Sequence, residues 1–319
     1  MGISHNLFYA RPPLGWGSLE PMAGFKRPKS NPAGYLFVAP ATLHLVVFAL
    51  FPLLYTLYLS FFRWNLIRED KQFLGLGNYV YSLTDPLFWN AMWNSLRYSI
   101  VGVPVGMAIA LAVALIVNQK LKGVTIFRTL FYIPAISSGV AIAMLWIYMY
   151  LPETGFINSF LALVGVNDKT DFLKNPALAM WSLVFMSLWV GLGPRMVLFL
   201  AGLVGIPSSL YEAAEIDGAT PWQSFRNVTL PMLAPTTLFV LVTSTIASFQ
   251  VFTPIYMMTQ GGPADSTDVI GYHIYSEAWQ KYLVGIAGAK SFLLFVGILL
   301  IAFIQFRMMK RQMSAYGAV

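Results

Sequence analysis

Six long apolar runs constrain this chain more than any other feature of its sequence. They cover residues 35–62, 92–117, 128–150, 177–203, 232–253 and 286–306. A helix of about 20 apolar residues is long enough to cross the hydrocarbon core of a bilayer. Only 10% of the residues are charged, whereas soluble domains carry about 25%. The sequence therefore predicts an all-α integral membrane protein with six transmembrane helices.

The distribution of Lys and Arg predicts the orientation of these helices, because short cytoplasmic loops carry an excess of both. With the N-terminus inside, the inner segments hold eleven: Arg11, Lys26, Arg27, Lys29, Lys120, Lys122, Arg128, Arg226, Arg307, Lys310 and Arg311. The outer segments hold six: Arg63, Arg68, Lys71, Lys169, Lys174 and Lys281. We therefore expect cytoplasmic tails at residues 1–34 and 311–319. Topology accounts for the net charge of +7, so no nucleic-acid partner is expected.

The apolar runs contain no Asp or Glu, although ion-driven carriers place such residues inside the membrane. The chain also lacks the Gly-x-x-x-x-Gly-Lys-Ser/Thr pattern that binds ATP phosphates. These observations predict that a separate chain supplies the energy. Cysteine is absent and the histidines (His5, His44 and His273) are far apart in sequence. We therefore expect no metal site, cofactor or catalytic residue in this chain.

Three cations fall within or beside the predicted helices. Arg97 and Lys290 lie near outer helix ends, where long side chains extend to the interface. Arg195 lies deeper, about 8 residues or roughly 12 Å from the cytoplasmic end of its run. We expect Arg195 to extend to that interface as well, with a role in a transport pathway as the alternative.

A polar segment between the fourth and fifth runs is predicted to form two short helices in the cytoplasm. Glu212–Asp217 is rich in the helix formers Ala and Glu. Gly218 can adopt a left-handed backbone that ends this helix. Thr220 and Pro221 suit the N-cap and the first position of the second helix. Pro231 is expected to break the chain before the next apolar run.

Several residues of this segment carry a family resemblance. Glu212-Ala213-Ala214, Asp217-Gly218-Ala219, Phe225 and Leu230-Pro231 resemble the "EAA" coupling loop of permease subunits in binding-protein-dependent ABC importers. The alternative is an ordinary cytoplasmic loop. The resemblance implies that the loop docks into a cleft of a cytoplasmic ATPase, that Glu212 pairs with an ATPase arginine, and that Gly218 forms the bend.

Two outer loops are similar to those of the sugar-permease branch of this family. One contains Gly75-Leu76-Gly77-Asn78-Tyr79, and the other contains Thr259-Gln260-Gly261-Gly262-Pro263 followed by Ser266-Thr267. The resemblance extends from Tyr35 to Arg311. It implies a type I ABC importer permease fold. The first helix would occupy residues 35–66, and a type-1 transmembrane domain, residues 90–310, would contain helices two to six and the coupling loop at 208–231.

Polar residues on the helices that flank the coupling loop are candidates for a sugar pathway. Sugars require hydroxyls, amides and aromatic faces. The candidates, some by chemistry and others by position in the family, are Ser187, Trp189, Gly191, Ser244, Ser248, Gln250 and Val251. In the alternative, the serine hydroxyls bond to their own helices and Trp189 only packs. Val251 stands where an amide is possible in relatives, so direct contact with substrate is an open question.

The resemblance implies a permease subunit of an ATP-driven carbohydrate importer in a prokaryotic inner membrane. Its partners would be a second homologous permease, two ATPase subunits that bind ATP and Mg, an extracytoplasmic solute-binding protein, carbohydrate and membrane lipid. One alternative is an ABC permease for glycerol-3-phosphate, a polyol or another small solute. Another is an ATP-independent secondary carrier or channel. A membrane scaffold protein would leave the coupling loop unexplained.

Overall fold

The computed structural model describes residues 32–67, 71–119, 123–166 and 169–315. The chain divides into two compact units, residues 1–53 and 54–319. In the first unit, α1 (Pro32–Leu45) continues through a π turn, η1 (Val46–Leu50), into α2 (Phe51–Ser60). Most of the predicted N-terminal tail, residues 1–31, lies outside the described residues. The helical stretch Gly34–Ser60 is long and apolar enough to span a membrane.

Three further helical stretches of spanning length lie in the second unit. The first is α4 (Pro86–Val117). The second, Ala234–Met258, comprises α13 (Ala234–Phe249) and α14 (Thr253–Met258). The third, Val284–Met309, lies within α16 (Val284–Ala315). Two bent pairs of helices also qualify when each is counted as one span. The described residues thus hold four to six candidate spans, and the predicted all-α membrane fold is confirmed.

The bent pairs differ from the continuous helices predicted at 128–150 and 177–203. The first pair, α5 (Val124–Ile136) and α6 (Gly139–Met149), bends by 99°, and the second, α8 (Ala179–Val190) and α9 (Leu192–Val204), by 46°. The first break contains two serines with extended backbones, Ser137 and Ser138, and serine favours helix caps over helix interiors. The second break is at Gly191, and glycine is a poor helix former. Hydropathy alone does not report these interruptions.

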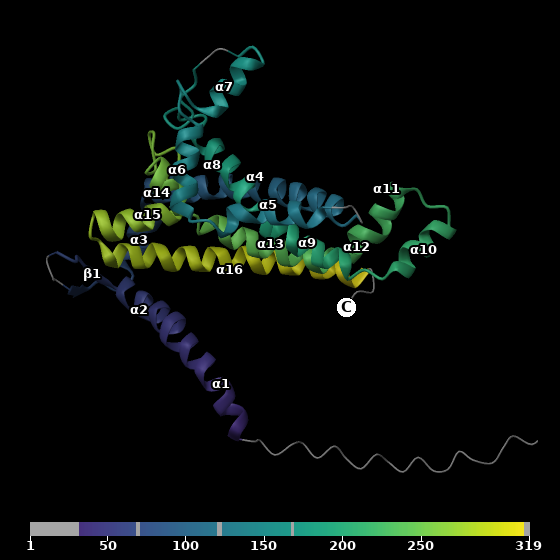
Figure 1. Ribbon diagram of the computed structural model, residues 1–319. Coiled ribbons are helices and arrows are strands. Elements are labelled where there is room, and N and C mark those ends of the chain that lie inside the picture. Colours follow the sequence, from purple (N-terminus) through teal and green to yellow (C-terminus); the bar gives the residue numbers. More distant parts are fainter. Residues whose placement is uncertain (1–31, 68–70, 120–122, 167–168, 316–319) are drawn as a thin grey trace, which may run out of the picture. The chain divides into compact units, whose positions relative to one another are not determined.

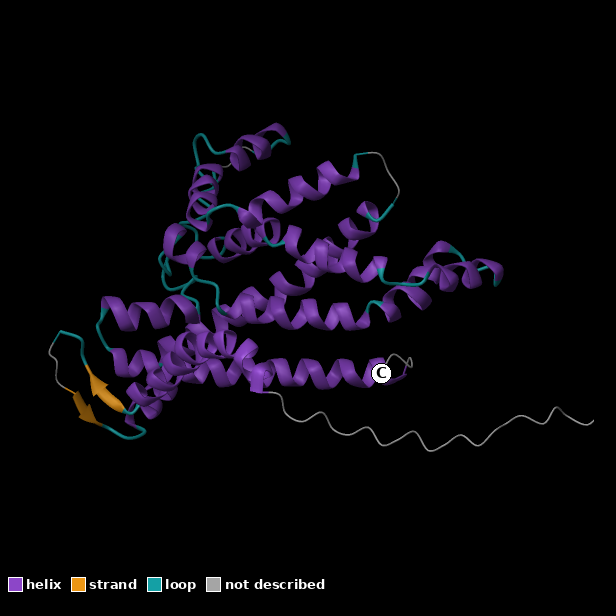
Figure 2. Cartoon of the chain, turned by 60° about the horizontal axis from the view of Figure 1, so that its bottom comes forward, coloured by secondary structure: helices purple, strands orange, loops and turns teal. Residues whose placement is uncertain are grey.

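Helix α4 is the centre of the second unit. It packs against α8, α9 and α13, and α13 also packs against α16; Figures 1 and 2 show these helices side by side. Ala110 and Ala114 of α4 are fully buried against Met196 and Phe199 of α9. Small side chains allow two membrane helices to approach closely, which explains why α4 and α9 form the largest buried cluster.

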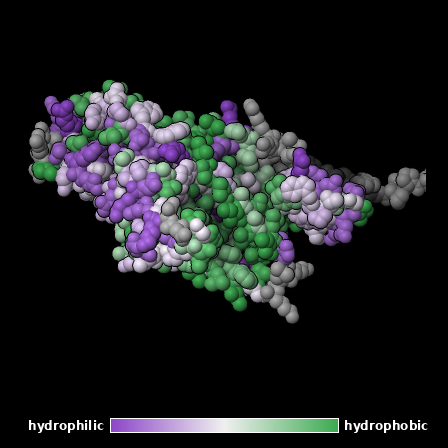
Figure 3. All heavy atoms as spheres, turned by 90° about the horizontal axis from the view of Figure 1, so that it is seen from above, coloured by the Kyte–Doolittle hydropathy of each residue, from purple (hydrophilic) through white to green (hydrophobic). Residues whose placement is uncertain are grey.

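The two ends of the bundle carry different elements. The end of α16, α10 (Ser208–Ile216) and α11 (Pro221–Ser224) lie at the same end of the bundle. The opposite end carries α3 (Gly77–Thr84), α15 (Ile270–Tyr275) and a π turn, η3 (Ser276–Gln280). On the face drawn in Figure 3, apolar residues form a band between polar ends. Such a band suits the hydrocarbon layer of a bilayer.

Two small elements belong to loops that the sequence predicts to be outside. The antiparallel strands β1 (Phe62–Trp64) and β2 (Lys71–Phe73) form a hairpin that the sequence did not predict. Its strands are only three residues long, too short to show an alternating pattern. Lys71 lies 4.8 Å from the ring centre of Phe62 and 5.5 Å from that of Trp64. A short helix, α7 (Phe156–Leu163), follows α6.

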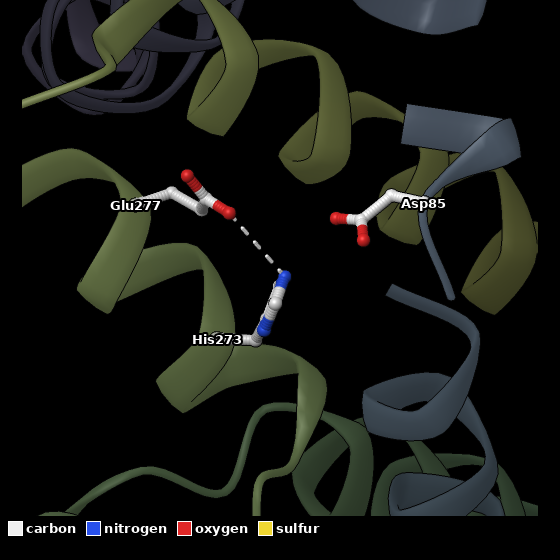
Figure 4. A group of neighbouring side chains, drawn as sticks. All are labelled: Asp85, His273 and Glu277. Atoms are coloured by element: carbon white, nitrogen blue, oxygen red, sulfur yellow. Dashed lines mark ion pairs between the residues drawn. The ribbon is translucent and has the colours of Figure 1, made fainter. Parts of the chain in front are cut away.

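A buried cation joins four elements at the end of the bundle that carries α15. The ammonium of Lys290, on α16, donates to Asp85 Oδ2 at 2.8 Å, His273 Nε2 at 2.8 Å and Glu277 Oε1 at 2.9 Å. Figure 4 shows how the side chains of Asp85, His273 and Glu277 face a common centre. Lys290 is fully buried, so the prediction that it extends to the interface is wrong. Its three N–H groups have three acceptors.

The same contacts fix the proton on His273. Because an ammonium only donates, His273 Nε2 must accept, and Nδ1 carries the hydrogen that it donates to Asp268 Oδ2 at 2.8 Å. One ligating atom from each of Asp85, His273 and Glu277 lies within 4.8 Å of the others, as in a metal site. The sequence prediction considered histidines alone and missed this cluster. Here the Lys290 ammonium already provides the positive charge.

Replacing Lys290 by methionine is expected to lower stability strongly, because it leaves two carboxylates buried without their cation. Breaking a buried ion pair from one side costs about 3–5 kcal/mol. Lys281→Met is the control, since Lys281 is half exposed beside the same Glu277 and exposed pairs contribute at most about 1 kcal/mol. Thermal unfolding in detergent should give a much lower midpoint for Lys290→Met. Equal midpoints for the two variants would contradict the role of Lys290.

The cluster also predicts how stability depends on pH. Burial raises the pKa of Asp85 and Glu277, but hydrogen bonds from Lys290 and its charge outweigh burial, so each pKa lies below its usual value. Carboxylates of this kind stabilise the fold above their unfolded pKa values, about 3.9 and 4.3, and lose that contribution as pH falls through the lower folded values. The unfolding midpoint of the wild type should therefore fall more steeply on acidification than that of Asp85→Asn/Glu277→Gln. Parallel curves would exclude this linkage.

Candidate functional site

A cavity of about 390 Å³, with a mostly apolar lining and a few polar side chains, lies where interrupted helices meet. Its lining includes Pro134, Ser137 and Gly139 at the α5–α6 break, Gly191 at the α8–α9 break, and Thr253 after the gap between α13 and α14. Within a membrane, non-helical backbone is tolerated only where it is buried in protein or lines a water-filled space. Three interruptions around one cavity therefore indicate a path for solute.

The structure places some of the predicted pathway residues at this cavity and others elsewhere. Ser187, Gly191 and Ser248 line it. Ser244 lies next to it through a hydrogen bond from Arg195 Nε at 3.2 Å. The remaining three do not line it: Trp189 packs on Trp146 with ring centres 5.8 Å apart, Gln250 is exposed, and Val251 packs against a buried apolar cluster.

The serine hydroxyls at the cavity make local bonds as well as bonds across helices. Ser187 donates to Leu183 O at 2.9 Å and pairs with the hydroxyl of Tyr98 on α4. Ser248 lies 2.8 Å from Thr245 O, within its own helix, and 2.7 Å from Ser99 Oγ on α4. These serines thus join α4 to α8 and α13. Tyr98 and Ser99 were missed, because a hydroxyl in an apolar run gives no signal of what it faces.

Arg195 is part of the cavity lining, so the expectation that it extends to the interface is wrong. Its guanidinium fits against two glycines. A Cβ at Gly106 would lie 2.2 Å from Arg195 Nη1, and one at Gly191 would lie 2.9 Å from the same nitrogen. Any other residue at these positions would displace the guanidinium. A charged residue within an apolar run marked Arg195 as a candidate in the sequence. Only the packing of the helices shows that its side chain lies at the cavity.

The second feature is the elbow, which we define as residues 208–232. Its first helix, α10, ends in a left-handed glycine, Gly218, with φ of +72°. Gly218 N–H bonds to Glu215 O at 3.0 Å, and Ala219 N–H bonds to Ala214 O at 2.9 Å. This pairing is the Schellman motif, in which glycine is favoured because it has no Cβ. The predicted bend at Gly218 is present.

The second helix of the elbow begins with a reciprocal cap. Gln223 N–H bonds to Thr220 Oγ1 at 3.3 Å, and Thr220 N–H bonds to Gln223 Oε1 at 2.7 Å, with Pro221 at the first helical position. This arrangement is a capping box. The predicted N-cap is confirmed, and the partner at Gln223 is an addition from the structure.

Pro231 does not break the chain as predicted. Helix α11 continues through a π turn, η2 (Phe225–Thr229), into α12 (Leu230–Met232). In the π turn, Leu230 N–H bonds to Phe225 O, five residues back, so the ladder has already changed register at the residue before Pro231. The missing N–H of proline is thereby accommodated. The same order, a π turn and then a proline, occurs at η1 and Pro52.

A tertiary bond holds the two arms of the elbow together. Tyr211 on α10 and the buried Thr229 of η2 are hydrogen-bonded, with their oxygens 3.0 Å apart. Between the arms is a cavity of about 430 Å³. Its lining includes the predicted coupling residues Ala213, Ala214, Asp217, Gly218 and Ala219. Glu212 is exposed on α10, Phe225 and Pro231 are half-buried, and Leu230 is partly exposed.

Broken spans around a cavity with a few polar side chains, and a braced elbow at one end of the bundle, are features expected of a membrane permease. The chain belongs to the family described as binding-protein-dependent transport system inner membrane component, whose family model matches residues 102–312. It is a subunit of an ABC transport system that depends on a binding protein. The predicted membrane domain, residues 90–310, overlaps this match almost completely.

Individual relatives cover most of the chain. It is 38% identical to the probable ABC transporter permease protein YesP of Bacillus subtilis, over 88% of this chain and 91% of the relative. It is 35% identical to the lactose transport system permease protein LacF of Rhizobium radiobacter, over 86% and 92%. A solved bacterial ABC transporter involved in import of the acidic polysaccharide alginate is similar with a TM-score of 0.77 and 26% identity, over 88% and 95%.

Gly218→Ala is expected to loosen the end of α10. The φ of +72° costs an L-residue roughly 1–2 kcal/mol, and a Cβ here would meet no atom within 4 Å, so backbone strain is the whole effect. Amide hydrogen exchange in the last turn of α10 should rise roughly 5–30-fold. Gly218→Asn, which tolerates this backbone, should exchange nearly as slowly as wild type. Equal exchange in all three proteins would contradict the assignment.

Proposed function

We propose that this chain is the permease subunit of an ATP-driven carbohydrate importer. Relatives named for lactose transport and for alginate import support a saccharide as the solute. The cavity supports it as well, because its volume of about 390 Å³ lies within the range of ligand sites, ~300–1,000 Å³. The hydroxyls of Tyr98, Ser187 and Ser248 suit a solute rich in hydroxyls.

The proposed assembly contains a second homologous permease, two ATPase subunits that bind ATP and Mg, and an extracytoplasmic solute-binding protein, in a prokaryotic inner membrane. The end of α16 and the elbow lie at the same end of the bundle. With the excess of Lys and Arg in the segments on that side, this arrangement favours a cytoplasmic elbow and cytoplasmic termini. Residues 316–319 of the predicted C-terminal tail lie outside the described residues.

The elbow is the observation that carries the mechanism. Glu212 is exposed for an ATPase arginine, and the exposed apolar side chains Ile216 and Trp222 flank the bend. A braced helix pair with one acidic and two apolar exposed residues suits a groove on a soluble partner. In the proposed cycle, ATP binding closes the ATPase dimer and moves the elbow, the cavity opens outward to receive solute, and hydrolysis returns it.

We assign the solute pathway to the cavity residues Ser187, Gly191, Ser248 and Arg195, with Ser244 behind Arg195. An ATP-independent carrier is the alternative class. The acidic residues Asp85 and Glu277 lie just outside the candidate spans, and both carboxylates are paired with Lys290. A pair that is satisfied at the end of the bundle is a poor ion carrier, which favours an external ATPase.

Reconstitution tests the proposal directly. The purified complex in liposomes should accumulate a labelled disaccharide only when ATP and the solute-binding protein are both supplied. The non-hydrolysable analogue of ATP should abolish net uptake, because the cycle then stops after one closure. Uptake driven by a proton or sodium gradient without ATP would overturn the proposal.

Glu212→Lys should uncouple the ATPase from transport, because it places a cation against the expected arginine. We expect uptake to fall about tenfold or more while thermal unfolding of the permease stays unchanged, since Glu212 is exposed. Glu153→Lys is the matched control: it makes the same change in charge at an exposed site after α6. Wild-type uptake by Glu212→Lys would contradict the docking role.

A further inference from the structure

Lys290, which is buried, and Arg195, which is partly buried, differ in how many hydrogen-bond acceptors they have. Lys290 has three acceptors, two of which are carboxylates. Arg195 Nε donates to one neutral hydroxyl, Ser244 Oγ, at 3.2 Å. Arg195 Nη1 is buried and has no hydrogen-bond partner among the described residues. Arg195 thus holds a positive charge with unused donor capacity.

The cavity around Arg195 supplies no compensating charge. Among the described residues that line it, none is Asp or Glu. The oxygens that face it are neutral hydroxyls and backbone carbonyls, and the rest of the lining is apolar or glycine. A buried charge is costly without a partner of opposite charge. Within the described lining of the cavity, Arg195 therefore has no anionic partner.

The position of the guanidinium is fixed by shape. Gly106 on α4 and Gly191 at the α8–α9 break leave the only space in which Arg195 Nη1 can lie so close to both backbones. The serine behind it, Ser244, orients the opposite edge through Nε. A guanidinium held at one edge presents its remaining N–H groups in a fixed fork, and this geometry matches the two oxygens of a carboxylate or phosphate.

We propose that the transported solute is an anionic saccharide, and that Arg195 binds its carboxylate or phosphate group within the cavity. The inference rests on the proposed function, since it names the class of substrate for the same pathway. Tyr98 and Ser187 lie on the same cavity wall and would bind hydroxyls of the sugar ring. Relatives named for a neutral sugar and for an acidic polysaccharide leave this point open, so Arg195 is the residue that decides it.

Matched pairs of solutes test the proposal on the whole complex in detergent, without the solute-binding protein. Cellobiouronate and cellobiose differ by a carboxylate, and glucose 6-phosphate and glucose differ by a phosphate. Calorimetric titration of the wild type should show the anionic member of at least one pair binding about tenfold or more tightly. The pair with the larger preference identifies the anion. Equal binding within both pairs, or no binding of any probe, would overturn the proposal.

Variants locate the preference at Arg195. Arg195→Gln should remove the preference for the anion and change binding of the neutral member less than about twofold, whereas Arg195→Lys should retain part of it. Gly106→Ala should also reduce the preference, because its Cβ would displace Nη1. Arg97→Gln is the matched control, since Arg97 lies over the ring of Trp181, 5.8 Å from its centre, and does not line the cavity. It should keep the preference.

The outcomes separate this inference from the proposed function. If Arg195→Gln weakens the binding of anionic and neutral solutes equally, or keeps the preference for the anion, Arg195 is not the anion site. Equal weakening would mean that Arg195 pairs with an acidic residue of a partner subunit. ATP-dependent uptake of cellobiose by the same complex, reconstituted in liposomes with the solute-binding protein, would then leave the importer assignment intact. Absence of any ATP-dependent uptake would instead count against the importer assignment itself.

Discussion

A backbone that crosses hydrocarbon has to satisfy its own polar groups, and an unbroken helix is the simplest way to do so. The second unit follows this rule in α4 and α16 and departs from it at Ser137–Ser138, at Gly191 and between α13 and α14. All three departures adjoin one cavity. The position of the cavity thus follows from the places where the helices stop being continuous.

Charge inside the bundle follows a related rule. Lys290 is tolerated because Asp85, His273 and Glu277 converge on it from three elements, and this convergence ties the start of α4 to α15, η3 and α16. Arg195 has no such set of acceptors within the described chain. The two cations therefore differ: the chain itself supplies the acceptors of Lys290, whereas in our proposal a ligand supplies those of Arg195.

Much of the architecture could be predicted from the sequence, because the signals were local. Apolar runs of spanning length gave the candidate helices, and the order of Gly218, Thr220 and Pro221 gave the bend and the cap of the elbow. These features depend on backbone preferences of single residues. The elbow proved to be the most predictable part of the candidate site for the same reason.

The features that could not be predicted depend on residues far apart in the chain. Asp85 and Lys290 are 205 residues apart, so nothing near either one shows the pair. Tyr98 reaches Ser187 through packing of α4 on α8. The prediction for Pro231 failed because proline was treated as a helix breaker. The π turn before Pro231 shifts the hydrogen-bond register, so that the helix continues without the missing N–H of proline. Three predicted pathway residues do not line the cavity: Trp189, Gln250 and Val251.

The continuation of the helix through Pro231 has a mechanical consequence. Leu233 N–H bonds to Thr229 O at 2.9 Å and Thr237 N–H to Leu233 O at 2.8 Å, so hydrogen bonds carry the rod past the turn at Leu233. Pro221 and Ser244 are then connected by nearly continuous helical backbone through α11, η2, α12 and α13. In the proposed cycle, a movement of the elbow would therefore be passed along helical backbone to Ser244, which accepts the hydrogen bond of Arg195.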